Sequence, residues 1–532
     1  MVAAEDDALD MLQYCLSGSI KDIPTWGHEY LRTLAGHIGI QYDKNVADGK
    51  DNDDLYKLVD LIVPNFIDHN EEPEAVDLMM ETESLNKLNA FCNEHNYDRV
   101  CRYLCACSQY AADTEEMSMS YKTAFTIYKS QRQYCDALRV AQKMNNTEMI
   151  TEIMEACQDP ITKKQMAFML GRQRNPYECD DDEINQIIAQ EKLSEYYKQL
   201  ARDLDQMDPK HPDQHIFKTH LEERKVGEAQ LDSAKQNLAK TYVNAFVNAG
   251  LCNDLMICKK EEGSNDDWVF SNKDEGQLAA AASLGLLQIW DIDEGLESID
   301  KYMERSEDNI QAGSYLALGI LNSGIKNDAD AAYAILMDKL ESATKQSHKI
   351  GILMGLSIAY AGSCRADLLE LISPIIVDSD NSIELQAIAS LAIGLIFCGS
   401  CDQDAAECIT QILLEKDEKD LEHSFTRIFA LGLGLLFLGQ QSLVDTQIEV
   451  LTMLPHENMA KFVTLVLETC AYAGSGNVLN IQKLLHLCAE HKDKENEKES
   501  IHQIAAVLGI ALISFGEEIG QEMCIRTMHH LL

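Results

Sequence analysis

The sequence predicts an all-α protein in which helical hairpins stack into an α-solenoid, and three observations support this prediction. An apolar segment rich in small residues recurs about seven times between Gly276 and the C-terminus. Elsewhere apolar residues recur every three or four positions, which is the period of a helix buried on one face. Alternating β-branched runs bounded by turns do not recur, and the chain has 9 prolines, so strands are not expected.

The recurring segment ends on a glycine, and the spacing of these ends gives the repeat length. Its clearest copies are Leu316–Gly324, Leu391–Gly399 and Leu431–Gly439, and a degenerate first copy has Trp290 in the glycine position. The closing positions are 290, 324, 362, 399, 439, 474 and 516, so successive copies lie 34, 38, 37, 40, 35 and 42 residues apart. A period of roughly 35–40 residues is typical of a solenoid of helix pairs.

Each repeat is expected to contain two antiparallel helices of different character. The first helix carries small residues, such as Gly313 and Gly319 in one copy and Gly351 and Gly355 in another. Glycine inside a helix costs about 1 kcal/mol relative to alanine, so close approach of neighbouring backbones is the expected compensation. The second helix is amphipathic, and its clearest examples are Ala331–Leu340, Asp367–Ile376 and Gln447–Met453.

The chain is expected to divide into three segments. Residues 1–210 form helical hairpins without a fixed period and include the acidic loop Tyr177–Glu183. Residues 211–275 form a connecting helical segment that follows a break at Asp208–Pro212; it holds a long helix over Leu231–Val247 and the acidic loop Gly263–Asp267. Residues 276–532 hold about seven repeats in an incomplete array.

Bulk composition restricts the classes of partner and the compartment. The chain has 45 Lys and Arg against 88 Asp and Glu, a net charge of −43, which disfavours nucleic acid and anionic membranes and favours basic protein surfaces. Its longest apolar runs are about half of the roughly 20 residues that a bilayer span needs. The acidic start, Met1 to Ala8, is unlike a signal peptide, and the 17 cysteines lie in apolar helical patterns. A reducing compartment, cytoplasm or nucleus, is therefore expected.

The end of the chain departs from the usual pattern of a solenoid. Terminal repeats usually carry a polar outer face, whereas this chain stops at the apolar residues Leu531 and Leu532 in the middle of the array. We therefore expect either that the array continues beyond a truncation or that a partner covers its end.

The motifs of the common catalytic and metal sites are missing from the sequence. The chain contains no phosphate-binding Gly-x-x-x-x-Gly-Lys-Ser/Thr loop and no Gly-x-Ser-x-Gly nucleophile elbow. His28 and His456 are each followed by glutamate but lack the second histidine of a zinc-protease helix, and Cys398 and Cys401 have no second pair at zinc spacing. No catalytic residue, metal or cofactor is expected, although a thiol hydrolase that uses one of the cysteines stays an alternative.

One acidic and apolar cluster is a candidate for protein binding. Glu517, Glu518 and Glu522 begin a predicted helix beside Ile519 and Met523. Carboxylates at a helix N-terminus are already favoured by the helix dipole, so their presence there has a purely structural explanation. An apolar patch with an acidic rim would nevertheless suit a small partner whose apolar patch is ringed by basic residues.

Longer stretches of the chain resemble a known family. The segments Leu278–Leu286, Cys470–Leu479 and Gly516–Gly520, with Trp26–Arg32 and Lys164–Arg172 outside the repeats, are similar to the proteasome/cyclosome-repeat subunits of the 26S proteasome regulatory particle. The resemblance covers essentially the whole chain after about residue 10. It implies an α-solenoid in the base of the regulatory particle, non-catalytic and in contact with the proteasomal ATPase ring and other regulatory-particle subunits.

The same resemblance implies partners and a place for the site. Family members dock ubiquitin, the ubiquitin-like domains of shuttle factors and a deubiquitinase on the repeats, which here indicates Glu517, Glu518, Ile519 and Glu522. Family members are longer than this chain, so the ring of repeats cannot close within it. A helical adaptor in another large assembly, such as the anaphase-promoting complex, shares the repeat type, but Trp26–Arg32 and Lys164–Arg172 favour the proteasome.

Overall fold

The computed structural model describes residues 9–18, 23, 25–108, 111, 114–217, 233–258, 268–327, 329–489, 497–516 and 518–531. Every secondary-structure element within these ranges is a helix, which confirms the predicted all-α class. The chain forms two compact units, Met1–Ile188 and Ala189–Leu532. The division into three segments at residues 210 and 275 stays a prediction.

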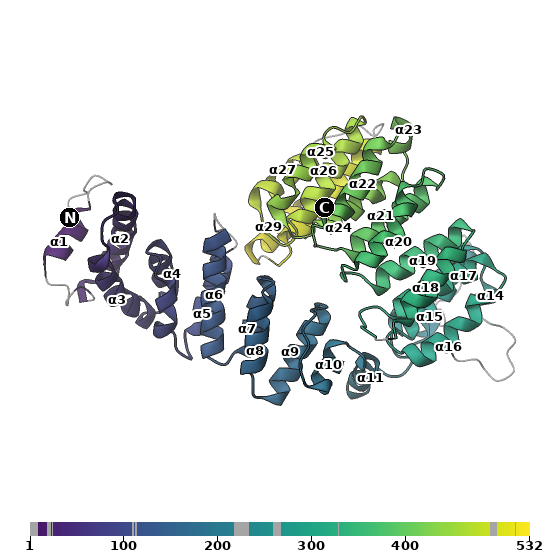
Figure 1. Ribbon diagram of the computed structural model, residues 1–532, viewed down its shortest axis with the longest axis horizontal. Helices are drawn as coiled ribbons and strands as arrows, with labels where there is room; N and C mark the ends of the chain where they lie inside the picture. Colours follow the sequence, from purple (N-terminus) through teal and green to yellow (C-terminus); the bar gives the residue numbers. More distant parts are fainter. Residues whose placement is uncertain are drawn as a thin grey trace. The chain divides into compact units, whose positions relative to one another are not determined.

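The first unit consists of short helices in which neighbours along the chain pack on one another, for example α3 on α4 and α6 on α7 (Figure 1). Local chemistry sets their ends: the side chains of Asn146 and Asp159 accept N–H bonds at the starts of α8 and α9 (3.1 and 2.9 Å). Its elements are α1 (Asp10–Ser17), α2 (His28–Asp48), α3 (Asp53–Asp68), α4 (Glu72–Glu81), η2 (Leu85–Phe91), α5 (Tyr97–Cys107), α6 (Thr114–Ser130), α7 (Tyr134–Lys143), α8 (Thr147–Ala156), α9 (Pro160–Arg172) and α10 (Asp182–Ile188).

The second unit contains the repeats, in which first helices alternate with second helices as predicted (Figure 1). The first helices are α13 (Ser233–Val247), α15 (Glu275–Leu287), α17 (Asp308–Leu321), α19 (Gln346–Ala359), α21 (Ile383–Ile396), α24 (Thr426–Leu436), α26 (Glu457–Ala471) and α28 (Glu497–Ser514). The second helices are α16 (Ile292–Met303), α18 (Ala331–Ser342), α20 (Ala366–Val377), α22 (Gln403–Glu415), α25 (Asp445–Leu451), α27 (Val478–Ala489) and α29 (Glu518–Leu531). The shorter elements are α11 (Leu193–Asp203), α12 (Pro212–His215), α14 (Trp268–Ser271), α23 (Glu418–Leu421) and η3 (Gln441–Val444).

Consecutive first helices pack directly on each other, and small residues set how close they come. A methyl group on Gly319 of α17 would lie 2.1 Å from the backbone oxygen of Gly355 in α19. A methyl group on Gly394 of α21 would lie 2.4 Å from the backbone oxygen of Gly432 in α24. The backbones themselves therefore form the crossing, which is the compensation for helical glycine that the sequence led us to expect.

The closing positions form backbone hydrogen bonds between successive repeats. All seven predicted positions have φ between 70° and 85°, the left-handed region. At one of them, the N–H groups of Gly362 and Cys364 donate to the carbonyls of Leu395 and Ile396 at the end of the next first helix (2.9 and 3.1 Å). The last carbonyls of a helix lack a partner within it, so this repeat caps the helix that follows it. Equivalent bonds join Gly399 to Leu435, Cys401 to Leu436, Gly439 to Cys470, Gly474 to Leu512 and Gly476 to Ile513.

Trp290 occupies the closing position of its repeat without being glycine. Its φ is 70°, and its N–H donates to the carbonyl of Leu321 (3.0 Å). The left-handed conformation costs a non-glycine residue roughly 1–2 kcal/mol. The indole offsets this cost, because Nε1 donates to the carbonyl of Ser323 (2.9 Å) and the ring packs edge-on against Tyr197.

Helix α13 joins the stack of first helices ahead of the predicted start of the repeats. It packs against α15, and the N–H groups of Gly250 and Cys252 donate to the carbonyls of Leu286 and Leu287 (3.0 Å each). Gly250 has φ 72°. The structure therefore places the bonding pattern of a closing position one repeat earlier than residue 290.

Two strongly charged segments between repeats are partly helical. Residues 415–422 contain the short helix α23, and residues 490–500 are helical from Glu497. Glu and Lys are strong helix formers, so a run of charges does not by itself end a helix. The loop predicted over residues 263–267 lies outside the described residues.

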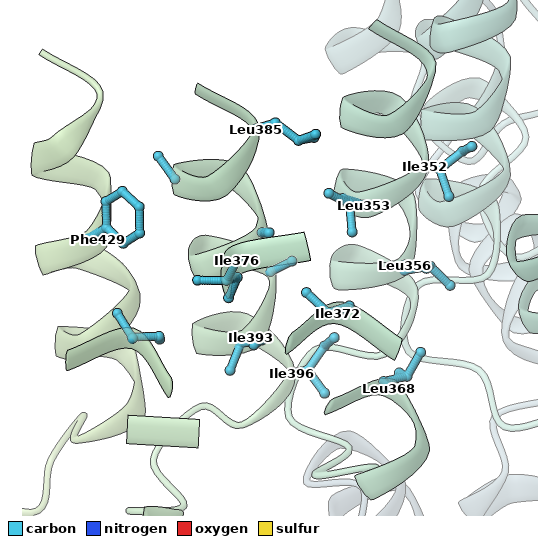
Figure 2. Packing of buried hydrophobic residues seen from close by; sticks show 14 of the residues in the cluster. Ile352, Leu353, Leu356, Leu368, Ile372, Ile376, Leu385, Ile393, Ile396 and Phe429 are labelled. Atoms are coloured by element: carbon cyan, nitrogen blue, oxygen red, sulfur yellow. The ribbon is translucent and has the colours of Figure 1, made fainter. Parts of the chain in front are cut away.

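Buried side chains between Ile257 and Ala471 form one core along most of the repeats. Figure 2 shows members of this cluster on α19 (Ile352, Leu353 and Leu356), on α20 (Leu368 and Ile372), and on α21 and α24. Contact between first and second helices thus continues from one repeat to the next, as expected for a solenoid.

A polar network also crosses three repeats. The amide nitrogen of Gln386 in α21 donates to the carbonyls of Ile376 and Asp378 (3.0 and 2.9 Å), and its oxygen accepts from Lys416 Nζ (2.7 Å). Lys416 also lies over the ring of Phe429. Burial lowers the pKa of the Lys416 ammonium group. Gln386 is itself buried, so it satisfies three polar groups that water cannot reach freely.

A half-buried histidine lies at the crossing of α17 and α19. His348 packs edge-on against Tyr315, and its ring nitrogen Nε2 lies 3.8 Å from Asp308. Burial lowers the pKa of His348; Lys345 also lowers it, and Asp308 opposes the change. The ring is therefore held in its neutral form in the folded protein at neutral pH.

Candidate protein-docking surface on α28 and α29

The four residues predicted from the sequence fall at the start of α29, and the structure describes them unequally. Glu517 lies outside the described residues, and α29 begins at Glu518, whose side chain, like that of Ile519, is also outside them. Glu522 is described and exposed, and it forms an i,i+4 ion pair with Arg526. The assignment of these residues as a binding site stays a prediction.

One face of α29 packs against the repeats, and the side chains on either side of that face are exposed to solvent. Cys524 is buried in a small cluster with Leu484, Ile510 and Ile513. Met523, which the sequence had placed beside the acidic residues, is exposed, as is Ile525. Because residues on a helix advance by about 100°, the side chains of residues 523 and 525 lie on either side of the ridge that carries Glu522.

Helix α28 adds a larger apolar stripe that the sequence analysis did not single out. Ile504, Leu508 and Phe515 are between 60% and 72% exposed, and Val507 and Leu512 are also exposed. Spacings of three and four residues place these side chains along one side of the helix. Together with Met523 and Ile525 they form what we call the α28–α29 surface. The signal in the sequence was that α28 is apolar on all sides between Ile504 and Ile513, although a helix at the surface needs only one apolar face.

The exposed side of α28 corresponds to the side that other first helices use for packing. Ala511 stands five residues before Gly516, the place that Gly319 and Gly394 occupy relative to their own closing glycines. Those glycines face the next first helix, whereas Ala511 is exposed. At this position α28 therefore carries the kind of small residue that the other first helices use for close packing.

The described acidic residue of this surface is already paired. Glu522 contributes a carboxylate, but Arg526 one turn later provides the opposite charge. Both side chains are more than two thirds exposed, so water and salt screen the pair and its energy is small. Apolar contact, more than a ring of acids, characterises the described part of this surface.

The cysteines do not have the environment of a catalytic nucleophile. Burial raises the pKa of Cys92 to about 12 and that of Cys470 to about 11. It also raises the pKa of Cys398 and Cys401, the Cys-x-x-Cys pair. A reactive thiol needs a lowered pKa, so these groups stay protonated at neutral pH and give the thiol-hydrolase alternative no support.

The described part of the chain lacks two further features. Within it, no group of three or more His, Cys, Asp or Glu side chains is arranged to hold a metal ion. None of the helices described here combines the length and the apolar character that a membrane span requires.

The architecture defines a class of protein: a helical-repeat solenoid whose repeats are joined through their backbones and whose last described helices expose an apolar surface. Comparisons with known proteins identify the family. A model of the RPN1 N-terminal domain matches residues 1–222. The chain belongs to the family of the 26S proteasome non-ATPase regulatory subunit 2, also called Rpn1.

Three relatives illustrate the extent of the similarity. The chain is 40% identical to the 26S proteasome regulatory subunit rpn-1 of Neurospora crassa, over 100% of this chain and 60% of that protein. It is 41% identical to the 26S proteasome non-ATPase regulatory subunit 2 of Dictyostelium discoideum, over 100% of this chain and 58% of the relative. It is 41% identical to the 26S proteasome regulatory subunit rpn1 of Schizosaccharomyces pombe, over 98% of this chain and 58% of that protein.

The chain thus spans about three fifths of the length of these relatives. Their names describe regulatory and non-ATPase subunits, which agrees with the expectation of a non-catalytic chain. All three are named as proteasome subunits, so the alternative of an adaptor in the anaphase-promoting complex finds no support among them.

Proposed function

We propose that this chain is a non-catalytic scaffold and receptor in the base of the 26S proteasome regulatory particle, where it supports ubiquitin-dependent protein degradation. The observation that carries the proposal is identity of about 40% to proteasome regulatory subunits along the whole chain. A solenoid held together by backbone bonds suits this role, because its outer side chains are free to contact partners. Its partners would be the proteasomal ATPase ring, other regulatory-particle subunits and a deubiquitinase, in the cytoplasm and the nucleus.

The proposal extends to ubiquitin and to the ubiquitin-like domains of shuttle factors, which would bind at α28 and α29. Exposed Leu508, Phe515 and Met523 supply apolar area for contact with the apolar patch of such a partner. Glu517, Glu518 and Glu522 would face the basic residues around the partner's apolar patch, with Ile519 between them. Opposite charges at the rim chiefly speed association and fix orientation.

The scaffold role is tested by a tagged pull-down from the source cell followed by mass spectrometry. Recovery of proteasomal ATPases and ubiquitin shuttle proteins is the expected result. Recovery of neither, from a chain that circular dichroism shows to be helical, would contradict the role for this portion of the protein. A thiol-reactive ubiquitin probe should leave the chain unlabelled, because burial raises the pKa of the thiols of Cys92, Cys398, Cys401 and Cys470.

The binding site is tested separately by titration with a purified ubiquitin-like domain. Glu517→Lys with Glu518→Lys should weaken binding several-fold, and Leu508→Asp should weaken it more strongly because it places a charge in the apolar contact. Glu407→Lys with Glu449→Lys, on the exposed sides of α22 and α25, makes the same charge change elsewhere and should leave affinity unchanged. Equal affinity for all four proteins would show that the site lies elsewhere on the chain.

A further inference from the structure

A hollow of about 470 Å³ lies in the second unit, away from α28 and α29. One wall is the start of α11, with Glu191, Ser194 and Glu195, and another is the turn from Trp290 into α16, with Asp291 and Asp293. Its size falls within the range of roughly 300–1,000 Å³ that is usual for ligand sites. The proposed proteasomal role makes no use of this hollow.

The hollow is strongly negative even after its positive contributions are counted. Glu191, Glu195, Asp291 and Asp293 line it, against the single ammonium group of Lys198. Two helix N-termini, those of α11 and α16, open at its walls, and each is equivalent to roughly half a positive charge. The balance is still about two negative charges, so the dipoles alone do not account for this many carboxylates.

Lys198 is already committed to one of these carboxylates. Its Nζ lies 2.5 Å from Asp291 Oδ2, and both side chains are less than one fifth exposed. The thiol of Cys252 approaches the same oxygen at 3.5 Å. Within the described residues, Glu191, Glu195 and Asp293 form no ion pair with a lysine or arginine, so three carboxylates of the hollow are left to a ligand.

An unsatisfied hydroxyl provides a second, independent observation. Ser194 lines the hollow and is 7% exposed, and its Oγ has no hydrogen-bond partner among the groups that the structure describes. A buried polar atom without a partner costs about 1–3 kcal/mol, so such atoms are uncommon. A donor that enters the hollow and meets Ser194 with a small side-chain rotation would remove this cost.

We propose that this hollow binds an arginine side chain presented by a basic segment of another protein. The guanidinium group has five N–H donors in a planar fork and no acceptor, which matches walls made of carboxylates and a hydroxyl. Its aliphatic stem would lie against Trp290, Ile292 and Ile325, the apolar members of the lining. Lysine fits less well, because its ammonium group is compact, strongly hydrated and unable to bridge separated carboxylates.

The test is calorimetric titration of the full chain, at low ionic strength, with the acetylated and amidated peptide Gly-Arg-Arg-Gly. The same peptide with citrulline in place of both arginines keeps the shape and removes the charge. The chain variant is Glu191→Gln with Glu195→Gln and Asp293→Asn. Its control is Glu370→Gln with Glu407→Gln and Glu449→Gln, three exposed carboxylates on other helices that give the same change in net charge.

We expect the arginine peptide to bind roughly tenfold more weakly to the hollow variant than to the control variant. This factor corresponds to the loss of at least one charge-assisted hydrogen bond. We also expect the citrulline peptide to bind the unaltered chain at least roughly tenfold more weakly than the arginine peptide. Equal binding to the two variants would mean that the peptide only responds to the overall charge of −43 and would overturn the proposal. The citrulline comparison tests only whether the charge of the peptide is needed. The peptide Gly-Lys-Lys-Gly has the same charge and should bind the unaltered chain several-fold more weakly than the arginine peptide; equal binding would overturn the proposal even if the triple substitution disturbs folding.

Discussion

Substitution of Gly319 by alanine tests whether backbone contact between first helices holds the array together. The added methyl group would lie 2.1 Å from the oxygen, 2.3 Å from Cα and 2.5 Å from the carbonyl carbon of Gly355. Ordinary contact begins at 3.4 Å, and these neighbours are backbone atoms that cannot rotate away. Helices α17 and α19 must therefore separate by about 1 Å, which forfeits a quarter to a half of each dispersion contact across the crossing.

The net energy follows from two opposing effects. Overpacking of this kind costs about 3 kcal/mol, and replacing a helical glycine by alanine returns about 1 kcal/mol. We therefore expect Gly319→Ala to destabilise this crossing by about 2 kcal/mol. Because 1.4 kcal/mol corresponds to a factor of ten, amide hydrogens of α17 and α19 should exchange roughly thirtyfold faster when exchange is limited by the local opening equilibrium.

Hydrogen-exchange mass spectrometry is the suitable assay, because a repeat array can open in parts and a single unfolding midpoint would average over them. Gly36→Ala in α2 is the matched control: Gly36 is exposed, and a methyl group there would meet nothing within 4 Å. It should stabilise α2 by about 0.5–1 kcal/mol and therefore slow hydrogen exchange in that helix. If Gly319→Ala also slowed exchange, or left it unchanged, the argument that glycine is present for close approach would be wrong.

Three further outcomes are expected. Gln386→Leu should destabilise the repeats around α21 by about 2–3 kcal/mol in urea unfolding, because it leaves buried polar groups without partners, whereas Gln411→Leu on the exposed face of α22 should have little effect. The repeats should lose stability as the pH falls below about 6.5, because His348 binds a proton more readily in the unfolded chain than in the folded one. His348→Phe should flatten this pH dependence of stability, and an unchanged slope would contradict the prediction. The apolar stripe of α28 should cause self-association, so that Ile504→Lys with Leu508→Lys shifts sedimentation towards the monomer; a monomeric parent chain at high concentration would refute this.

The sequence predicted the repeats well because their signal is a backbone requirement. All seven closing positions identified from the recurring segment have left-handed φ, including the one where Trp290 replaces glycine. A left-handed turn every 35–40 residues forces glycine, or a residue with compensating contacts, into fixed places, and such places are visible in one sequence. Helix starts and ends were less visible, as the helical charged stretch at Glu497 shows.

The place of α13 among the first helices and the exposed side of α28 could not be predicted from the sequence. Lys235, Gln236 and Asn237 make α13 polar near its start, so it lacks the run of small apolar residues that marks the other first helices, and only its packing on α15 reveals its place. On α28, the same types of apolar residue occupy both the buried and the exposed positions. The exposure of Leu508 depends on which elements pack against α28. This is set by the arrangement of the repeats and cannot be inferred from the residue type.

The same backbone bonds explain how an array of this kind can be both stable and variable. At Gly362 and Gly474 the contact to the next repeat uses N–H groups and carbonyls, which every residue except proline possesses. The crossings of first helices likewise need only small residues. Coupling between repeats therefore places few demands on side chains at the outer surface. Charged surfaces such as the hollow beside Trp290, and apolar ones such as the α28–α29 surface, can then change with their partners while the solenoid keeps its register.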